Sequence, residues 1–158
     1  KSHISNLAPQ AIKGFRAEQI EQLPKKIFKA LKINQLVQLS QDAITGLTTK
    51  QLKTLSGKEL LAFKPGQIQS IDPDGITGLK PKALNSLGQK QVKAFTEEQL
   101  AGLSKKQIKK SDSFISALSD QQLEALPISL SPSRSDRKIN PLDTLDALTN
   151  QPFVDPLA

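Results

Sequence analysis

The sequence predicts an all-α protein in which very short helices, one for each eight-residue repeat, stack into an α-solenoid or superhelix. Three observations lead to this prediction. An apolar residue recurs at every eighth position from Ile4 to Ile108 without a slip. A second apolar residue follows three positions after nearly every one of these. Between the pairs, residue types that start helices recur at a fixed place.

We label the repeat positions a to h, with the first apolar residue at a and the second at d. The a series is Ile4, Ile12, Ile20, Phe28, Leu36, Ile44, Leu52, Leu60, Ile68, Ile76, Leu84, Val92, Leu100 and Ile108. The d series is Leu7, Phe15, Leu23, Leu31, Leu39, Leu47, Leu55, Phe63, Ile71, Leu79, Leu87, Phe95 and Leu103. Residues three apart lie on one face of a helix, so each pair is expected to be buried against neighbouring helices.

Positions e, f and h carry the signature of a helix start. Residues that accept a hydrogen bond from a free N–H group stand at e in half of the copies: Ser40, Thr48, Ser56, Asp72, Thr96, Ser104, Asp112 and Ser119. Proline, which suits the first helical position, stands at f as Pro9, Pro65, Pro73 and Pro81. Glutamine, which completes a capping box, stands at h as Gln19, Gln35, Gln51, Gln67, Gln91, Gln99, Gln107 and Gln122. Each octad therefore starts a new helix of about two turns.

Small residues at position c predict a close approach between the backbones of neighbouring helices. They are Gly14, Ala30, Gly46, Ala62, Ser70, Gly78, Ser86, Ala94, Gly102, Ala117 and Ala125. The sequence leaves open whether two or three octads complete one turn of the superhelix, and which hand it takes.

A single long helix is disfavoured by the same pattern. Alternating spacings of three and five residues average 4.0 residues, against 3.6 per helical turn, so the apolar stripe would drift around the helix. Recurrent Pro and Gly would add about 1 to 3 kcal/mol each inside it. A strand fits no better, because the spacing has no period of two.

The repeat loses one residue near its end and then stops. The pair Ile115 and Leu118 comes one position early, and the pattern resumes at Leu123 and Leu126, so we expect a local break or bend within 108–115. The chain thus divides into an octapeptide-repeat region (1–128), a Ser-rich, charged linker (129–140) and a C-terminal tail or capping segment (141–158). A secretion signal is an alternative interpretation of the tail.

No constellation of residues indicates catalysis, a cofactor or a metal, so the sequence predicts a protein that is not an enzyme. The chain has no Cys, and His3 is its single histidine. The abundant Ser and Thr residues stand at cap positions without an adjacent base. Asp72-Pro-Asp74-Gly75 resembles the start of a calcium loop, but Ala83 stands where such a loop needs Glu.

Lysines give the strongest indication of a binding surface. They recur at positions g and b, which face solvent in the helical interpretation and form rows when repeated. The candidate polyanion contacts are Lys26, Lys50, Lys53, Lys58, Lys82, Lys90, Lys93, Lys106 and Lys109. A solvated face that keeps the repeat soluble is the simpler interpretation. Specific nucleic-acid recognition is disfavoured, since this region has one Arg and the chain has no Tyr or Trp.

Charge and hydropathy set further bounds. The 158 residues carry a formal net charge of +7, and the excess of basic residues falls within 1–128. No apolar run approaches the roughly 18 residues of a membrane-spanning helix. Because the sequence contains no Met, we expect it to be a processed product or a piece of a longer chain.

The runs Ile44-Thr-Gly-Leu-Thr-Thr-Lys-Gln-Leu52 and Phe95-Thr-Glu-Glu-Gln-Leu-Ala-Gly-Leu-Ser104 resemble the LTxxQIxxL octapeptide tracts of very large bacterial secreted or cell-surface proteins. The resemblance covers residues 4 to about 126. It implies an exported structural or adhesive region at the cell surface, although a cytoplasmic location stays open.

Two functions follow as hypotheses. The first is a non-catalytic scaffold or spacer whose partners are neighbouring domains of the same polypeptide or other surface proteins. The alternative is a binding module that takes a peptide in its groove, or an anionic polysaccharide or a membrane surface along its lysine rows.

Overall fold

The computed structural model describes residues 3–127, which form short helices and contain no strand. The all-α prediction is confirmed for this part of the chain. The linker (129–140) and the tail (141–158) lie outside the described residues. The helices are, in chain order, η1 (His3–Asn6), α1 (Pro9–Ile12), α2 (Ala17–Glu21), α3 (Lys25–Phe28), α4 (Ile33–Leu36), α5 (Gln41–Thr45), α6 (Thr49–Leu52), α7 (Gly57–Leu61), α8 (Pro65–Gln69), η2 (Pro73–Gly78), α9 (Pro81–Leu84), α10 (Gln89–Val92), α11 (Glu97–Ala101), α12 (Lys105–Lys110), α13 (Asp112–Ser116) and α14 (Asp120–Glu124).

The helices are shorter than the two turns expected from the sequence. The α-helices α1 to α14 have four to six residues each, little more than one turn. The reason is that each octad must also hold a corner. In the octad that starts with α6, the N–H of Leu55 bonds back to the carbonyl of Leu52 at 3.1 Å, and Ser56 is already extended (φ −82°, ψ 166°). Positions c to e therefore form the corner that directs the chain toward the next helix.

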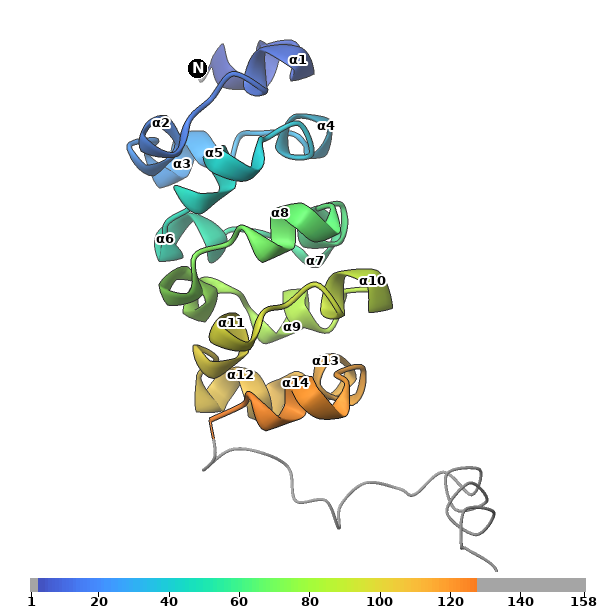
Figure 1. Ribbon diagram of the computed structural model, residues 1–158. Coiled ribbons are helices and arrows are strands. Elements are labelled where there is room, and N and C mark those ends of the chain that lie inside the picture. The colour runs from blue at the N-terminus through green and yellow to red at the C-terminus, as the bar shows by residue number, and fades with distance from the viewer. Residues whose placement is uncertain (1–2, 128–158) are drawn as a thin grey trace, which may run out of the picture.

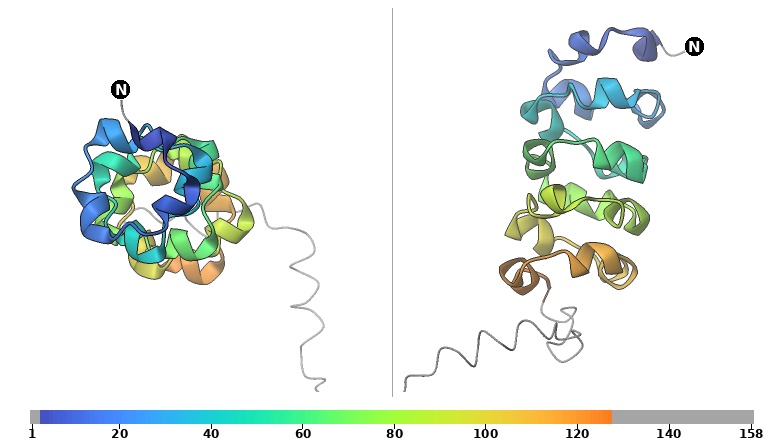
Figure 2. Two further views of the ribbon diagram at one scale, coloured as in Figure 1. Left: turned by 90° about the horizontal axis from the view of Figure 1, so that it is seen from above. Right: turned by 90° about the vertical axis from the view of Figure 1, so that its right-hand side faces the viewer.

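The chain winds in stacked turns, and each helix lies on the helix that precedes it by three octads (Figure 1). The pairs α2 with α5, α6 with η2, and α7 with α9 are packed in this way. The view along the stack shows the helices arranged as a ring (Figure 2). One turn thus consists of three octads, a number that the sequence left open.

Three columns of helices run the length of the stack as a result. The first column is η1, α3, α6, η2, α11 and α14. The second column is α1, α4, α7, α9 and α12. The third column is α2, α5, α8, α10 and α13.

The a and d side chains fill the interior of the stack. Every a residue from Ile12 to Ile108 is at most 7% exposed, and most d residues are buried as well. Leu7, at 41% exposed, is an exception and belongs to the first of the described turns. Burial of an apolar pair between turns supplies the stability that an isolated one-turn helix lacks in water.

The small residues at position c allow close approach between turns, as the sequence predicted. A Cβ atom added to Gly46 would collide with the backbone of Ala17, and one added to Gly78 would collide with the backbone of Thr49. Both contacts join a c position to the first residue of a helix in the preceding turn. The structure thus identifies the neighbour that the sequence could not name.

Buried glutamines at position h tie each turn to the one before it. In each case the side-chain Oε1 accepts from the N–H of its own cap residue, while Nε2 donates to the carbonyls of an a and a d residue in the preceding turn. In Gln99, Oε1 lies 3.1 Å from the backbone nitrogen of Thr96, and Nε2 lies 2.8 Å from the carbonyl oxygen of Ile68 and 2.7 Å from that of Ile71. The glutamines that make both Nε2 bonds, all buried, are Gln35, Gln51, Gln67, Gln99, Gln107 and Gln122.

The phase slip is absorbed at one corner and does not interrupt the stack. The backbone changes direction at Ser111 (φ −121°, ψ 50°), the residue between α12 and α13. Beyond it, Gln122 bonds to Val92 and Phe95, each one position nearer in the chain than the partners of the earlier glutamines. The missing residue therefore shortens one corner and leaves the vertical contacts in place. Asn85 bridges this corner, donating to the carbonyl of Lys110 and accepting from the N–H of Phe114.

Candidate functional site

The Ser and Thr residues predicted at cap position e do cap helices. The side chain of each of these residues accepts a hydrogen bond from the third N–H of the helix it starts: Ser40, Thr48, Ser56, Thr96, Ser104 and Ser119. Asp72 caps η2 by accepting from the N–H of Asp74 at 2.8 Å. The prediction that Asp112 is a cap is wrong, because the shortened repeat makes it the first residue of α13 and Ser111 the residue before the helix.

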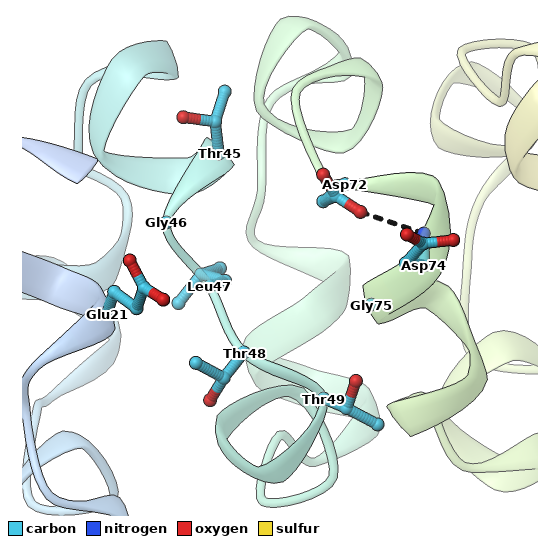
Figure 3. Close-up of a pocket in the computed structure, with 9 residues that line it drawn as sticks. All are labelled: Glu21, Thr45, Gly46, Leu47, Thr48, Thr49, Asp72, Asp74 and Gly75. Carbon is cyan, nitrogen blue, oxygen red and sulfur yellow. Dashed lines mark hydrogen bonds between the residues drawn. The ribbon is translucent and has the colours of Figure 1, made fainter. Parts of the chain in front are cut away.

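A cavity of about 400 Å³ lies at a corner of the stack and is lined on two sides by acidic side chains. Glu21 contributes a carboxylate from the end of α2, and Asp72 and Asp74 contribute theirs from the start of η2 (Figure 3). The carboxylate of Asp72 points at the N–H of Asp74, which is its capping role. Within the described residues, no group of three acidic, His or Cys side chains has a geometry that would hold a metal ion.

Two further cavities lie between corners of successive turns. One of about 490 Å³ is lined by 37–41 together with Lys13, Lys64 and Gln67. Another of about 500 Å³ is lined by 21–25 and 48–51. Both are lined by a mixture of polar and apolar corner residues, such as Val37 and Leu39 in the first and Leu23 and Pro24 in the second, and neither groups side chains suited to catalysis.

The winding divides the nine predicted lysine contacts among the three columns. Lys26, Lys50 and Lys53 lie on α3 and α6 in the first column, and Lys90 and Lys93 lie on α10 in the third. The second column receives Lys58, Lys82, Lys106 and Lys109. All nine are exposed, as expected for positions g and b.

The second column also gathers lysines that are not among the nine predicted contacts. Together they form a surface that we call the lysine face: Lys13, Lys32, Lys58, Lys80, Lys82, Lys105, Lys106, Lys109 and Lys110, all exposed. Glu59 is the single acidic residue among the described residues of this column. Lys32, Lys80, Lys105 and Lys110 stand outside positions g and b, and the stacking of helices three octads apart brings them and Lys13 together with the predicted contacts.

The other two columns have mixed charge. On the first, lysines occupy α3 and α6, whereas acidic residues occupy η2, α11 and α14. On the third, basic and acidic residues are equal in number, with four of each counted from Arg16 to Asp112. The excess positive charge of the described residues is thus concentrated on one of three faces.

Comparisons with protein-family models, with curated protein sequences and with solved structures find no match to this chain. Among the described residues, no helix has the length and apolar character needed to cross a bilayer.

Proposed function

We propose that the repeat region is an α-solenoid that serves as a non-catalytic scaffold or spacer in a larger, exported bacterial surface protein. The observation that carries the proposal is the ladder of buried glutamines. Each links a helix start only to the turn directly before it, as Gln51 does with Ile20 and Leu23. An array held together by such nearest-neighbour contacts is extended by adding turns, which is the property that a spacer needs.

The use of polar side chains supports the same function. Buried glutamines complete the stacking, and Ser and Thr hydroxyls cap helices, so these groups already have structural roles. The export and surface location in the proposal come from the resemblance of the octads to LTxxQIxxL tracts. Neighbouring domains of the same polypeptide, or other surface proteins, are its proposed partners.

Small-angle scattering with circular dichroism on residues 1–128, at low and high salt, tests the proposed shape. Sixteen helices at three per turn, with a helix-to-helix distance of about 8–10 Å, form a stack roughly 40–50 Å long. We expect a helical monomer whose radius of gyration exceeds the roughly 14 Å of a compact domain of this length and does not change with salt. A compact particle would contradict the proposal.

Deleting one whole turn gives a sharper test. Removal of residues 49–72 joins the cap Thr48 to Pro73 and preserves the register of the stacked turns, so the particle should stay helical and shorten by about 8–10 Å. Removal of 49–68 deletes two and a half octads, shifts the repeat by half an octad and should unfold the helices that follow. Equal tolerance of both deletions would overturn the nearest-neighbour model.

A further inference from the structure

The lysine face follows the helices of the second column along the stack. In this column α7 packs on α9 and α9 on α12, and α1 packs on α4. Every helix of this column carries or directly adjoins at least one exposed lysine, and α12 carries four. Lysines therefore repeat along the stack at the spacing of packed helices, about 8–10 Å. Such a row concentrates the positive potential of the protein on one side.

The face also turns around the stack. In Figure 1 the second column lies on the right side at α4 and on the left side at α12. A planar membrane surface would contact only part of such a stripe. A flexible, linear polyanion is able to follow all of it.

The chemistry of the face favours a polysaccharide over a nucleic acid. It has no Arg among its described residues to form a two-pronged contact with phosphate or guanine. The chain has no Trp or Tyr on which bases would stack. What the face offers is a row of point charges on flexible aliphatic stems.

Two exposed aliphatic side chains belong to helices of the same column. Ile33 on α4 and Leu61 on α7 are 43% and 44% exposed, and they belong to successive turns of the second column. The C–H faces of pyranose rings pack against aliphatic groups of this kind. The combination of lysines and isolated aliphatic side chains therefore fits a charged sugar polymer.

We propose that the lysine face binds a linear anionic polysaccharide, carboxylated or sulfated, which runs along the second column from α1 to α12. The lysine ammonium groups contact its acidic groups, and Ile33 and Leu61 contact its rings. This binding activity goes beyond the scaffold function and depends only on the arrangement of the columns. A solenoid of the proposed shape that fails to bind would leave the scaffold proposal intact.

The test compares two variants of equal net charge. In the first, Lys58, Lys82, Lys106 and Lys109 of the lysine face are replaced by Gln. In the second, Lys25, Lys26, Lys50 and Lys53 of the first column are replaced by Gln. All eight side chains are exposed, so both proteins should fold, and circular dichroism verifies this. Binding of the full chain to polygalacturonate and to dextran sulfate is measured by calorimetry from 50 to 300 mM NaCl.

We expect wild-type binding that weakens steeply as salt increases. Loss of four contacts on the lysine face should weaken it by at least about tenfold, and loss of four lysines on the first column by less than about threefold. The double variant Ile33→Ser/Leu61→Ser should weaken binding without changing its salt dependence, because no charge is removed.

Three outcomes would overturn the proposal. Equal losses in the two lysine variants would show that net charge alone attracts the polymer. Tighter binding to a 20-base-pair DNA duplex than to either polysaccharide would assign the face to nucleic acid. Binding only to anionic phospholipid vesicles would assign it to a membrane surface.

Discussion

The side-chain amide of Gln51 donates a 2.7 Å hydrogen bond to the carbonyl of Ile20, which belongs to the preceding turn of the stack. The same Nε2 donates to Leu23 at 2.9 Å, and Oε1 accepts from the N–H of Thr48 at 2.9 Å. One side-chain amide thus accepts from the cap of α6 and also donates to the carbonyls at the corner after α2, in the preceding turn. A glutamate would satisfy the first role but would lack a donor for the second.

Gln51→Glu should therefore destabilise the protein. Two buried carbonyls would lose their donor and face a carboxylate oxygen, so we expect the free energy of unfolding to fall by about 1–3 kcal/mol. Urea unfolding followed by circular dichroism measures the change. Gln19→Glu is the matched control, since Gln19 is exposed, lies in the first turn and makes the capping bond to Arg16 N–H. It should change stability by less than about 0.5 kcal/mol. Equal losses would refute the role of Nε2.

Glu59→Gln should have the opposite effect. Glu59 occupies position h of α7 and accepts from the N–H of Ser56 at 2.7 Å, as the glutamines do from their caps. By the register of the repeat, a glutamine there would have the carbonyls of Phe28 and Leu31 as acceptors, as Gln51 has those of Ile20 and Leu23. The amide should add about 0.5–1.5 kcal/mol of stability. Glu98→Gln, which changes an exposed residue at position g, is the control and should leave stability unchanged. If it stabilised the protein by a similar amount, the removal of a negative charge, and not the new amide donor, would be the cause.

Gly46→Ala should be costly although alanine favours helices. The added methyl would collide with the backbone of Ala17 on the neighbouring turn, which cannot rotate away as a side chain would. We expect a loss of about 1–3 kcal/mol in thermal or urea unfolding. Gly14→Ala changes the same repeat position, but the nearest atom to the new Cβ is the carbonyl oxygen of Ala11 at 3.9 Å. That variant should be neutral or slightly stabilising, and a comparable loss would exclude close approach as the cause.

Ser111→Ala should raise stability. Ser111 is 1% exposed and its hydroxyl has no hydrogen-bond partner, because the shortened corner puts a serine at the d position that is apolar in other octads. Removing the unpaired group should add about 1 kcal/mol. Ser119→Ala removes a hydroxyl that caps α14 by accepting from the N–H of Gln122, and it should cost about 1 kcal/mol. Changes of the same sign in the two variants would contradict this assignment.

Leu55→Asp should unfold several neighbouring octads. Leu55 is 2% exposed. Truncation of a buried leucine to alanine lowers the free energy of unfolding by about 2–5 kcal/mol, and burial of a carboxylate should lower it further. Lys53→Glu, close by on the exposed surface, should leave the helical dichroism signal unchanged. If Lys53→Glu reduced the signal as strongly, the assignment of buried and exposed positions would be wrong.

The sequence predicted local structure well, because the residues that cap a helix and those that are buried recur within each octad. Thr48 and Gln51 spell a capping box, and both of its hydrogen bonds are present. Pro65 and Pro81 begin helices, and the a and d residues are largely buried. The helices came out shorter than expected, since the corner takes residues that the pattern alone assigns to the helix.

The candidate site was predicted less well. Lys58 and Lys106 were identified from their exposed repeat positions, whereas Lys13, Lys32 and Lys80 were not selected with them. These residues are far apart in the sequence, and they share a face only because α1, α4, α7, α9 and α12 form one column. The eight-residue period says nothing about which octads are stacked.

By itself, then, the sequence determined the helical class, the eight-residue unit, the helix starts and the buried pairs, because caps and apolar spacing act within one octad. The tertiary structure decided that three octads make a turn, that the glutamine amides bond to the turn before, and that one column collects the lysines. Those features depend on contacts between residues at least three octads apart, and such contacts exist only once one turn has been laid on another.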